Sequence, residues 1–480
     1  MDMTVGATND APEMKNDFRT VFEEMVAAEN DFDLFSQTAG GVRYWEVARF
    51  EVFHRLLGTG STHQKHYDYG SKQTLGKMVA GVRGMAGAMR HQPFWPVAQA
   101  ENLIWLHERK WKVGDGLVDP YLSWLVERIG ADKCKVYDQG TAIGTYERRL
   151  APFEQTFDGV KLLSRAYGRI LRRGDLDDAA LRLLGELEDR FFRTLGASIP
   201  LKDIIALRIR YFQPAYALYR RLLAAMKPGR LIVAVAYDRH PIVAAANDLG
   251  VETFEMQHGV IGVYHPGYNY RSAVEIPYKP RHLLSFGEFW SGWGPFAPNM
   301  EFHAGGAPTL HDRLSRYRDG REKDIDVVFV SQSEHHDLFD FAVETVRLMK
   351  AGTMVFRPHP REDASGYVRF LKDNPDIRSH LRVADQSEEP DTLALLARTR
   401  YQVGVYSTAL LEGMQLGCTT IVVQQMGAEL FEHLVRDGLC LPADTPADAV
   451  AAVRAGVRHN TGIVPFEPAN ERVLGTVFGC

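Results

Sequence analysis

The apolar positions of the chain follow two different periods along its length. From residue 15 to about 95 they recur at helical spacing, and between 42 and 57 they form a broad apolar stripe. After that, short apolar runs of strand length alternate with amphipathic helical stretches, which is typical of a parallel sheet covered by helices. One longer helical stretch, at about 154–226, interrupts the alternation.

This alternation of strands and helices occurs twice. The first series contains strand-like runs such as 230–237 and 251–256, and the second begins with "DVVFVS". Between them, "HAGGAPTL" at 303–310 is rich in glycine and proline and predicts a linker. Two such series predict an α/β fold of two Rossmann-like, doubly wound domains that face a cleft. The expected divisions are an N-terminal helical region at 1–95, a first domain at 96–305 with the helical insertion 154–226, a second domain at 306–465, and a tail at 466–480 that could cross back to the first domain.

The composition is that of a soluble globular protein. The 480 residues are enough for two or three domains, and 45% of them are hydrophobic and 24% charged. A formal net charge of −5 argues against nucleic acid as the main partner. Four scattered cysteines, a polar start to the chain and the lack of an apolar run of about 18–20 residues favour a cytoplasmic protein.

Polar residues that directly follow predicted strands are candidate ligands, because open parallel sheets bind ligands beyond the carboxyl ends of their strands. In "MVFRPHPRED", Arg357 and His359 follow a strand, and the neighbouring prolines keep the loop extended. Arg357 offers a planar fork to phosphate oxygens, and His359 can donate a hydrogen bond or a proton to a departing phosphate. The alternative is a rigid strand exit with both side chains at the surface.

Two more strand ends of the second domain carry hydroxyl, amide and carboxyl groups. Ser407 and Thr408 stand where a strand turns into a helix, so the helix N-terminus could bind an anion. Glu412, about one turn later, could accept hydrogen bonds from ribose hydroxyls, although a plain cap with a surface glutamate fits the same pattern. Gln332 and Ser333 follow the first strand of this domain and could line the phosphate side of the cleft.

The first domain supplies candidate bases. Asp238 and His258 follow consecutive predicted strands, and each could take a proton from an incoming hydroxyl group. The structural alternatives are a helix cap for Asp238 and a backbone-bonded imidazole for His258. Gln257 and Gly259 flank His258, and Tyr268 stands further along the same loop, where it could contact an acceptor or pack in the core.

Other chemistry is not indicated by the sequence. "WLHERKW" places His107, Glu108 and Arg109 after an early strand, and we interpret this group as structural ion pairing. There is no GxxxxGK[ST], HExxH or GxSxG motif, and the cysteine spacing suits no metal site. We therefore expect neither a metal nor a cofactor.

Together, these motifs resemble the bacterial GT-B glycosyltransferases of surface-polysaccharide synthesis. The resemblance rests on "QHG" at the end of a first-domain strand, "RPHP" in the second domain and "YSTALLEGMQLG" after it. The stretch 257–290 looks like capsule and lipopolysaccharide biosynthesis proteins. The second-domain motifs are similar to those of the sialyl- and Kdo-transferases and the CDP-glycerol glycerophosphotransferases. The match covers roughly 230–425.

The resemblance implies an inverting, metal-independent glycosyltransferase that moves a sugar from a nucleotide-sugar, for example a CMP-linked one, to a glycan or lipid-linked glycan. The second domain would bind the donor, and His258 would act on the acceptor side. Two alternatives stay open: transfer of a polyol phosphate from a CDP-alcohol, and a non-catalytic scaffold of a polysaccharide assembly complex. We expect the stripe at 42–57 to pack in the core, with peripheral contact to the inner membrane as its alternative.

Overall fold

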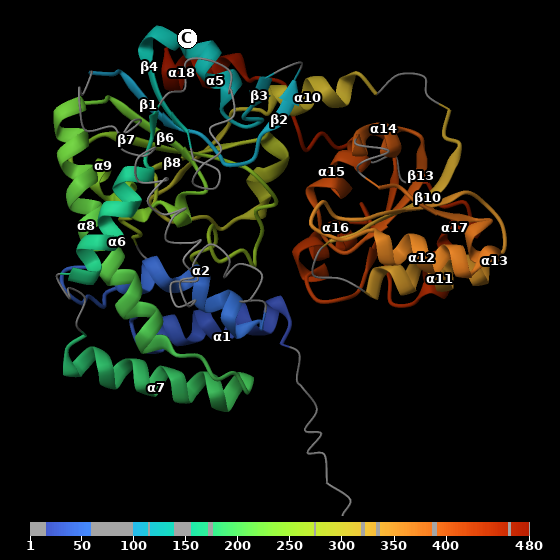
Figure 1. Ribbon diagram of the computed structural model, residues 1–480, viewed down its shortest axis with the longest axis horizontal. Coiled ribbons are helices and arrows are strands. Elements are labelled where there is room, and N and C mark those ends of the chain that lie inside the picture. The colour runs from blue at the N-terminus through green and yellow to red at the C-terminus, as the bar shows by residue number, and fades with distance from the viewer. Residues whose placement is uncertain are drawn as a thin grey trace, which may run out of the picture.

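Two α/β bodies lie side by side, each built on its own parallel sheet (Figure 1). The computed structural model describes residues 16–58, 99–113, 116–138, 155–170, 176–272, 275–317, 322–332, 337–385, 391–458 and 462–479. The predicted fold class, two Rossmann-like doubly wound domains, is confirmed by the strand orders described below.

The first sheet has seven parallel strands in the order β5-β4-β1-β6-β7-β8-β9. They are β1 (Asn102–Trp105), β4 (Cys134–Asp138), β5 (Gln155–Thr156), β6 (Arg230–Ala234), β7 (Glu252–Met256), β8 (His282–Ser285) and β9 (Glu301–Ala304). The chain starts in the middle at β1, moves outward on one side, and returns to place β6 beside β1. Ligands of doubly wound sheets bind where the winding direction reverses in this way, here between β1 and β6.

The second sheet repeats this plan with six parallel strands in the order β12-β11-β10-β13-β14-β15. They are β10 (Ile325–Val330), β11 (Met354–Arg357), β12 (Leu381–Val383), β13 (Thr399–Gly404), β14 (Thr419–Val423) and β15 (Leu441–Ala443). The associated helices are α11 (Asp337–Met349), α12 (Ser365–Asp373), α13 (Pro375–Arg378), α14 (Thr392–Ala397), α15 (Thr408–Gln415), α16 (Glu432–Arg436) and α17 (Pro446–Arg454). The reversal point of this sheet lies between β10 and β13.

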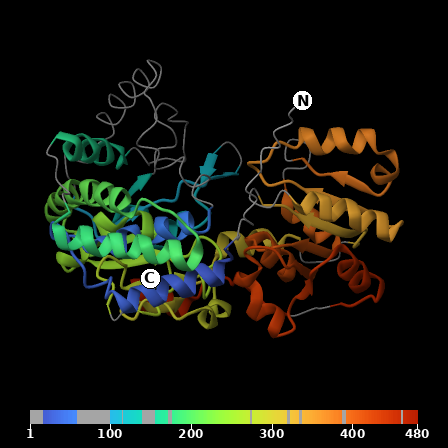
Figure 2. The same cartoon turned by 90° about the horizontal axis from the view of Figure 1, so that it is seen from below.

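Two N-terminal helices, α1 (Phe18–Asp31) and α2 (Tyr44–Leu56), lie along the lower side of the first domain (Figures 1 and 2). The apolar stripe of α2 is buried, including Trp45 and Phe53, so its predicted place in the core is correct and it offers no apolar face to a membrane. α1 also reaches the second domain, because the ring of Phe18 lies 5.8 Å from that of Tyr406.

The helical insertion and the remaining first-domain helices cover the first sheet. The insertion consists of α6 (Asp158–Ile170), α7 (Asp178–Leu195) and the long α8 (Leu201–Met226), and the others are α5 (Ser123–Ile129) and α9 (His240–Asp248). α8 packs along both α6 and α9. Among the described residues, no helix is long and apolar enough to cross a membrane.

The two domains are joined twice, on the upper side of Figure 1. α10 (Pro308–Ser315) leads from β9 into the second domain, and the chain later returns to end in α18 (Glu471–Phe478). The returning segment is bonded to the first domain, since Trp290 donates its indole N–H to the carbonyl oxygen of Pro465 at 2.7 Å. The ring of Phe478 then packs on Phe254 of β7.

Four short elements differ from the sequence prediction. β9 and α10 occupy most of 303–310, which was predicted as a linker. β5 and β15 were not predicted at all; they have two and three residues and lie at sheet edges. Edge strands this short carry too few positions to show a period, so their pairing depends on the neighbouring strand.

Candidate functional site

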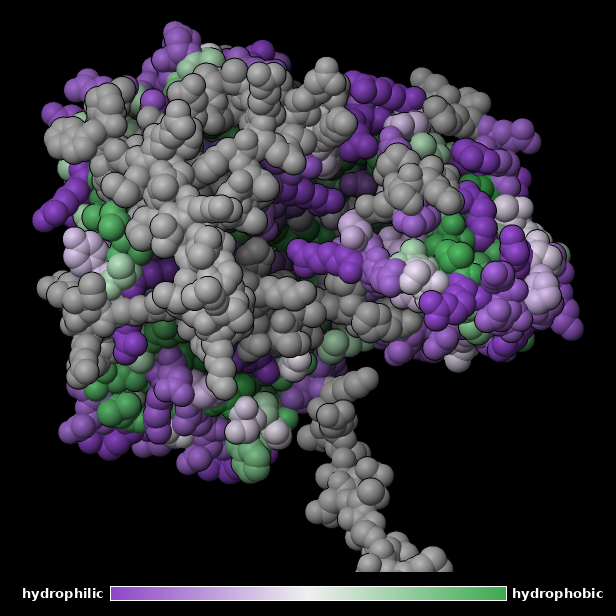
Figure 3. Space-filling model, viewed as in Figure 1, coloured by the Kyte–Doolittle hydropathy of each residue, from purple (hydrophilic) through white to green (hydrophobic). Residues whose placement is uncertain are grey.

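The surface is hollowed between the first domain and the second (Figure 3). Arg109 follows β1, and Glu412 lies on α15, which follows β13; the two opposite charges act on each other electrostatically. α15 is also tied to the returning C-terminal segment, because Gln415 exchanges two hydrogen bonds of 3.0 Å with the backbone of Phe466. The candidate site is therefore bounded by both domains.

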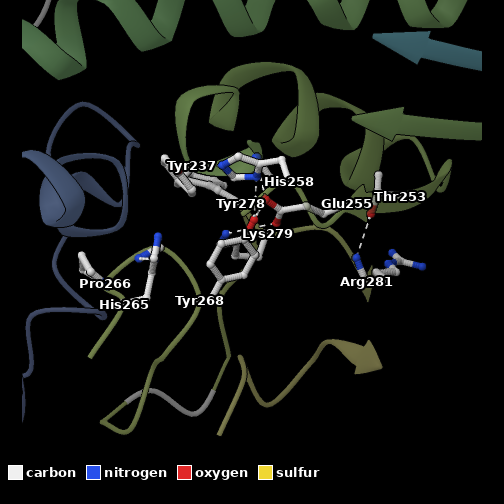
Figure 4. Close-up of polar contacts among 12 residues, drawn as sticks. Tyr237, Thr253, Glu255, His258, His265, Pro266, Tyr268, Tyr278, Lys279 and Arg281 are labelled. Atoms are coloured by element: carbon white, nitrogen blue, oxygen red, sulfur yellow. Dashed lines mark hydrogen bonds and ion pairs between the residues drawn. The ribbon is translucent and has the colours of Figure 1, made fainter. Parts of the chain in front are cut away.

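A chain of hydrogen bonds runs from the interior of the first domain to His258 (Figure 4). It begins at the carboxylate of Glu255, which accepts the backbone N–H of Ala236 at 2.8 Å and the hydroxyl of Tyr268 at 2.9 Å. The ammonium of Lys279 lies 3.4 Å from the other carboxylate oxygen, and both side chains of this pair are fully buried. The oxygen of Tyr268 in turn lies 3.2 Å from Nδ1 of His258.

These contacts determine which nitrogen of His258 carries the proton. The hydroxyl proton of Tyr268 is donated to Glu255, so the Tyr268 oxygen can only accept from the imidazole. Nδ1 is therefore the protonated nitrogen, and Nε2 keeps its lone pair. The hydroxyl of Tyr237 lies 3.2 Å from Nε2 and donates to it. His258 thus presents a basic nitrogen on the side of Tyr237.

The wall around His258 is electropositive. Burial, together with the charges of Arg239, Lys279 and Arg109, lowers the pKa of His258 to about 3. The ring of His107 stacks on His258 with centroids 5.4 Å apart, and its pKa is also lowered, by burial and by His258. Burial disfavours any added charge here, whereas the positive charges of Arg239, Lys279 and Arg109 favour an anionic ligand over a cationic one.

Arg109 is a further candidate residue of this site. It was grouped with structural ion pairs, but the ion pairs at this strand end are made by Lys110, with Asp138 at 2.9 Å and Asp119 at 3.8 Å. The side chain of Arg109 is exposed; it donates to the hydroxyl of Tyr121 at 3.3 Å and faces Glu412. The sequence gave no signal for which of the adjacent residues Arg109 and Lys110 would make the buried ion pairs.

The second-domain wall consists of the beginning of α15 and the end of β10. Ser407 is the N-cap of α15 and accepts the backbone N–H of Ala409 at 3.2 Å, while Thr408 is the first helical residue; both are partly exposed. Gln332 accepts the backbone N–H of Tyr406 at 3.3 Å, which links the ends of β10 and β13. Ser333 lies outside the described residues.

Arg357 does not point into the recess, contrary to the prediction of a phosphate-binding role. It is 3% exposed, and its guanidinium donates to the carbonyl oxygen of Ala384 and to the hydroxyl of Thr392, each at 3.0 Å. It therefore fastens the end of β11 to the segment after β12. His359 is partly exposed, and its backbone N–H donates to Glu362 at 2.8 Å.

Two of the predicted acceptor ligands are structural. Gln257 is fully buried, and its amide accepts the backbone N–H of Phe286 and donates to the carbonyl oxygen of Gly259, both at 2.9 Å. Tyr268 is 1% exposed, so it orients His258 rather than forming a platform. Asp238 is exposed at the end of a short 3₁₀ turn after β6, where it acts electrostatically on Arg239.

A small apolar pocket adjoins the His258 wall on the side of Tyr121. Trp111, Trp124, Phe286 and Leu310 are among the residues that line it. The guanidinium of Arg313 covers the ring of Trp111, 4.3 Å from its centroid. The pocket gives the first-domain wall an apolar section beside its charged one.

Comparison with known proteins gives similarity in overall fold alone. No protein-family model matches the sequence, and no curated protein is similar to it. Among solved structures, it is similar to the UDP-GlcNAc 2-epimerase of Methanocaldococcus jannaschii, with 10% identity, TM-score 0.41, and coverage of 79% of this chain and 99% of that one. The UDP-GlcNAc 2-epimerase of Neisseria meningitidis bound to UDP-GlcNAc has 8% identity, TM-score 0.37 and coverage of 74% and 90%. CalG4, the calicheamicin glycosyltransferase, has 13% identity, TM-score 0.37 and coverage of 74% and 89%.

Proposed function

We propose that the protein is an inverting, metal-independent glycosyltransferase that binds a nucleotide-sugar in the recess between its domains. One observation carries the proposal: an electropositive wall around Arg109 and His258 lies opposite Glu412 on α15. A nucleotide-sugar brings the two features that such a site recognises, which are negative phosphates and ribose hydroxyls. The proposed acceptor is a bacterial surface glycan or its lipid-linked precursor, an assignment supported by the sequence motifs.

In this proposal the phosphates of the donor lie between Arg109 and the N-terminus of α15. Arg109 takes the part that the sequence suggested for Arg357, because its guanidinium is accessible whereas that of Arg357 is bonded inside the domain. The first N–H groups of α15 add their partial positive charge. Such preorganised donors balance the charge of the departing phosphate, and a single one contributes about 2.7–4 kcal/mol to catalysis. Glu412 receives the ribose hydroxyls.

His258 serves the acceptor through Nε2. The hydroxyl of Tyr237 that donates to this nitrogen marks the direction from which an acceptor hydroxyl approaches. With a pKa of about 3, His258 is a weak base at neutral pH. The phosphates of a bound donor offset the charges of Arg109 and Arg239, so they raise this pKa. His258 then becomes an effective base only when the donor is in place.

The test is a thermal-shift panel of CMP, CDP, UDP, GDP and dTDP, followed by the nucleotide-sugars and CDP-alcohols of the base that binds. A ligand at one hundred times its Kd stabilises the folded state by about 2.7 kcal/mol. The shift should disappear in Arg109→Ala and persist in His258→Ala and in Arg182→Ala, a matched control on the exposed face of α7. Absence of a shift with every nucleotide refutes the proposal.

Turnover separates the remaining possibilities. With donor and acceptor glycan, the wild-type protein should release the nucleotide, and His258→Ala should bind the donor but lose turnover. Release of CMP only from a CDP-alcohol would instead identify a polyol-phosphate transferase. Binding without turnover of any donor, in the presence of lipid-linked and soluble glycans, would identify a scaffold.

A further inference from the structure

Three potential metal ligands converge on the edge of the first sheet that is formed by β8 and β9. Nδ1 of His282 lies 3.0 Å from Nε2 of His303, and Glu301 approaches both, with carboxylate oxygens 3.6 Å from His282 and 3.8 Å from His303. One ligand atom from each residue lies within 4.8 Å of the others. This group is separate from the candidate active site, because His282 begins β8 whereas the recess lies beyond the opposite ends of the strands.

The strand register explains why the three side chains meet. Glu301 pairs with His282 across the parallel ladder, and His303 pairs with Leu284, two residues further along. Because alternate residues of a strand point to the same face, Glu301 and His303 lie on the face that carries His282. Phe254 stacks on the ring of His282, with centroids 4.5 Å apart, and fixes its orientation. The arrangement is therefore built by the sheet and not by a loop.

The distances suit a transition-metal ion. An ion about 2.1 Å from each ligand atom, as Zn²⁺ is from imidazole nitrogen and carboxylate oxygen, spaces those atoms roughly 3.0–3.5 Å apart. The two imidazole nitrogens are 3.0 Å apart, and a different oxygen of Glu301 lies near each of them, at 3.6 and 3.8 Å, so a small rotation of this 67% exposed side chain would bring one oxygen close to both. Imidazole nitrogen with one carboxylate suits zinc and its neighbours better than calcium or magnesium, which prefer oxygen ligands.

We propose that His282, Glu301 and His303 bind a divalent transition-metal ion, for which Zn²⁺ is the best match, with water at the remaining position. The ion joins β8 to β9, the edge strand that leads into α10. Its role is to hold this edge of the sheet, so it is independent of the proposed transfer reaction. A cation bound to two strands of the folded state, and to nothing comparable in the unfolded chain, raises stability.

The experiment uses the untagged full chain after treatment with a chelator. Isothermal titration with ZnCl₂ should give one ion per chain, and Zn²⁺ should raise Tm. Both effects should be lost in His303→Ala and weakened in Glu301→Gln, whereas His380→Ala, a partly exposed histidine of the second domain, should behave as the wild type. Co²⁺ in place of Zn²⁺ should give the visible absorption of a nitrogen- and oxygen-bound ion, and His303→Ala should remove it.

Two results would overturn the inference. One is no saturable binding of Zn²⁺ or Co²⁺ to the wild-type protein, which would leave the two imidazoles as a simple hydrogen-bonded pair. The other is the same stoichiometry and affinity in His303→Ala, which would place the ion elsewhere. Glu301→Gln guards against loss of folding as an explanation, because this exposed side chain supports no other contact between the strands, and circular dichroism should match that of the wild type.

Discussion

The ion pair of Lys279 and Glu255 supports the candidate active site from inside, and its energetic role can be tested directly. The two charged groups lie 3.4 Å apart, and neither side chain is exposed to solvent. The ammonium group of Lys279 also lies over the ring of Tyr268, 5.1 Å from the ring centroid. Burial lowers the pKa of Lys279, while Glu255 opposes the shift and favours the charged form.

Replacing either partner alone leaves an uncompensated charge in the core. Such a loss costs about 3–5 kcal/mol, whereas replacing both partners by groups of similar volume is often neutral. Lys279→Met should therefore be strongly destabilising, since it leaves Glu255 with only its bonds to Ala236 and Tyr268. Glu255→Gln should cost a similar amount, and the double variant should recover most of the loss. For a domain of this size the single changes correspond to a fall in Tm of about 6–20 °C.

Calorimetry of the wild type, both single variants and the double variant closes the cycle. As a control for charge removal, Arg347→Met breaks an exposed pair with Glu344 on α11 and should shift Tm by less than about 2 °C. The reasoning is refuted if the two single effects simply add in the double variant, because the interaction energy of the pair would then be negligible.

Three further changes test other buried ionisable groups. Burial raises the pKa of Glu46 to about 8, so the folded state holds a proton that the unfolded chain releases near the ordinary pKa of glutamate. The contribution of Glu46 to the free energy of unfolding is therefore most favourable at low pH and is lost as the pH rises towards 8. Glu46→Gln should therefore gain stability relative to the wild type between pH 5 and 8, by at most about 4 kcal/mol, and a Tm difference that does not change with pH would contradict this. Burial lowers the pKa of His240 well below its ordinary value, so the unfolded chain binds a proton in acid that the folded state does not. Between pH 7 and 5 this should reduce the free energy of unfolding by about 2 kcal/mol. Tm should therefore fall less steeply with acid in His240→Gln than in the wild type. Arg49→Met should lower the free energy of unfolding, measured by chemical denaturation, by about 3–5 kcal/mol, because it leaves the buried carboxylate of Glu29 without the guanidinium that lies 2.5 Å away. Adding Glu29→Gln should restore part of the loss.

The sequence was sufficient to predict the architecture because buried parallel strands appear in it as short apolar runs that alternate with amphipathic helices. β6 is a nearly continuous apolar run, and β7, although it contains Thr253 and Glu255, is buried over its last four residues and stops abruptly at Gln257. The same rule pointed to α15, where a strand passes through Ser407 into a helix. Positions after strands could therefore be found from the pattern alone.

The direction of a side chain at such a position could not be found in this way. Arg357 ends β11 and Arg109 follows β1, yet Arg357 is buried and bonded inside its domain whereas Arg109 is exposed. Arg357 turns away because the oxygens of Ala384 and Thr392, 27 and 35 residues later in the chain, accept its N–H groups. Those acceptors are brought there by the pairing of β11 with β12 and by the start of α14, and no local pattern carries that information.

The "QHG" after β7 contains a structural residue, Gln257, beside the residue for which we propose a function, His258. The amide of Gln257 holds the backbone of Phe286 and of Gly259, so the peptide that carries His258 is fixed to the exit of β8. Tyr268 then determines which imidazole nitrogen is free. The orientation of the His258 ring therefore depends on two buried, hydrogen-bonded side chains, those of Gln257 and Tyr268. Gln257 and Tyr268 are buried, yet they set the position and the protonated nitrogen of His258, the residue that we propose contacts the acceptor. A functional motif can therefore contain more structural than catalytic positions.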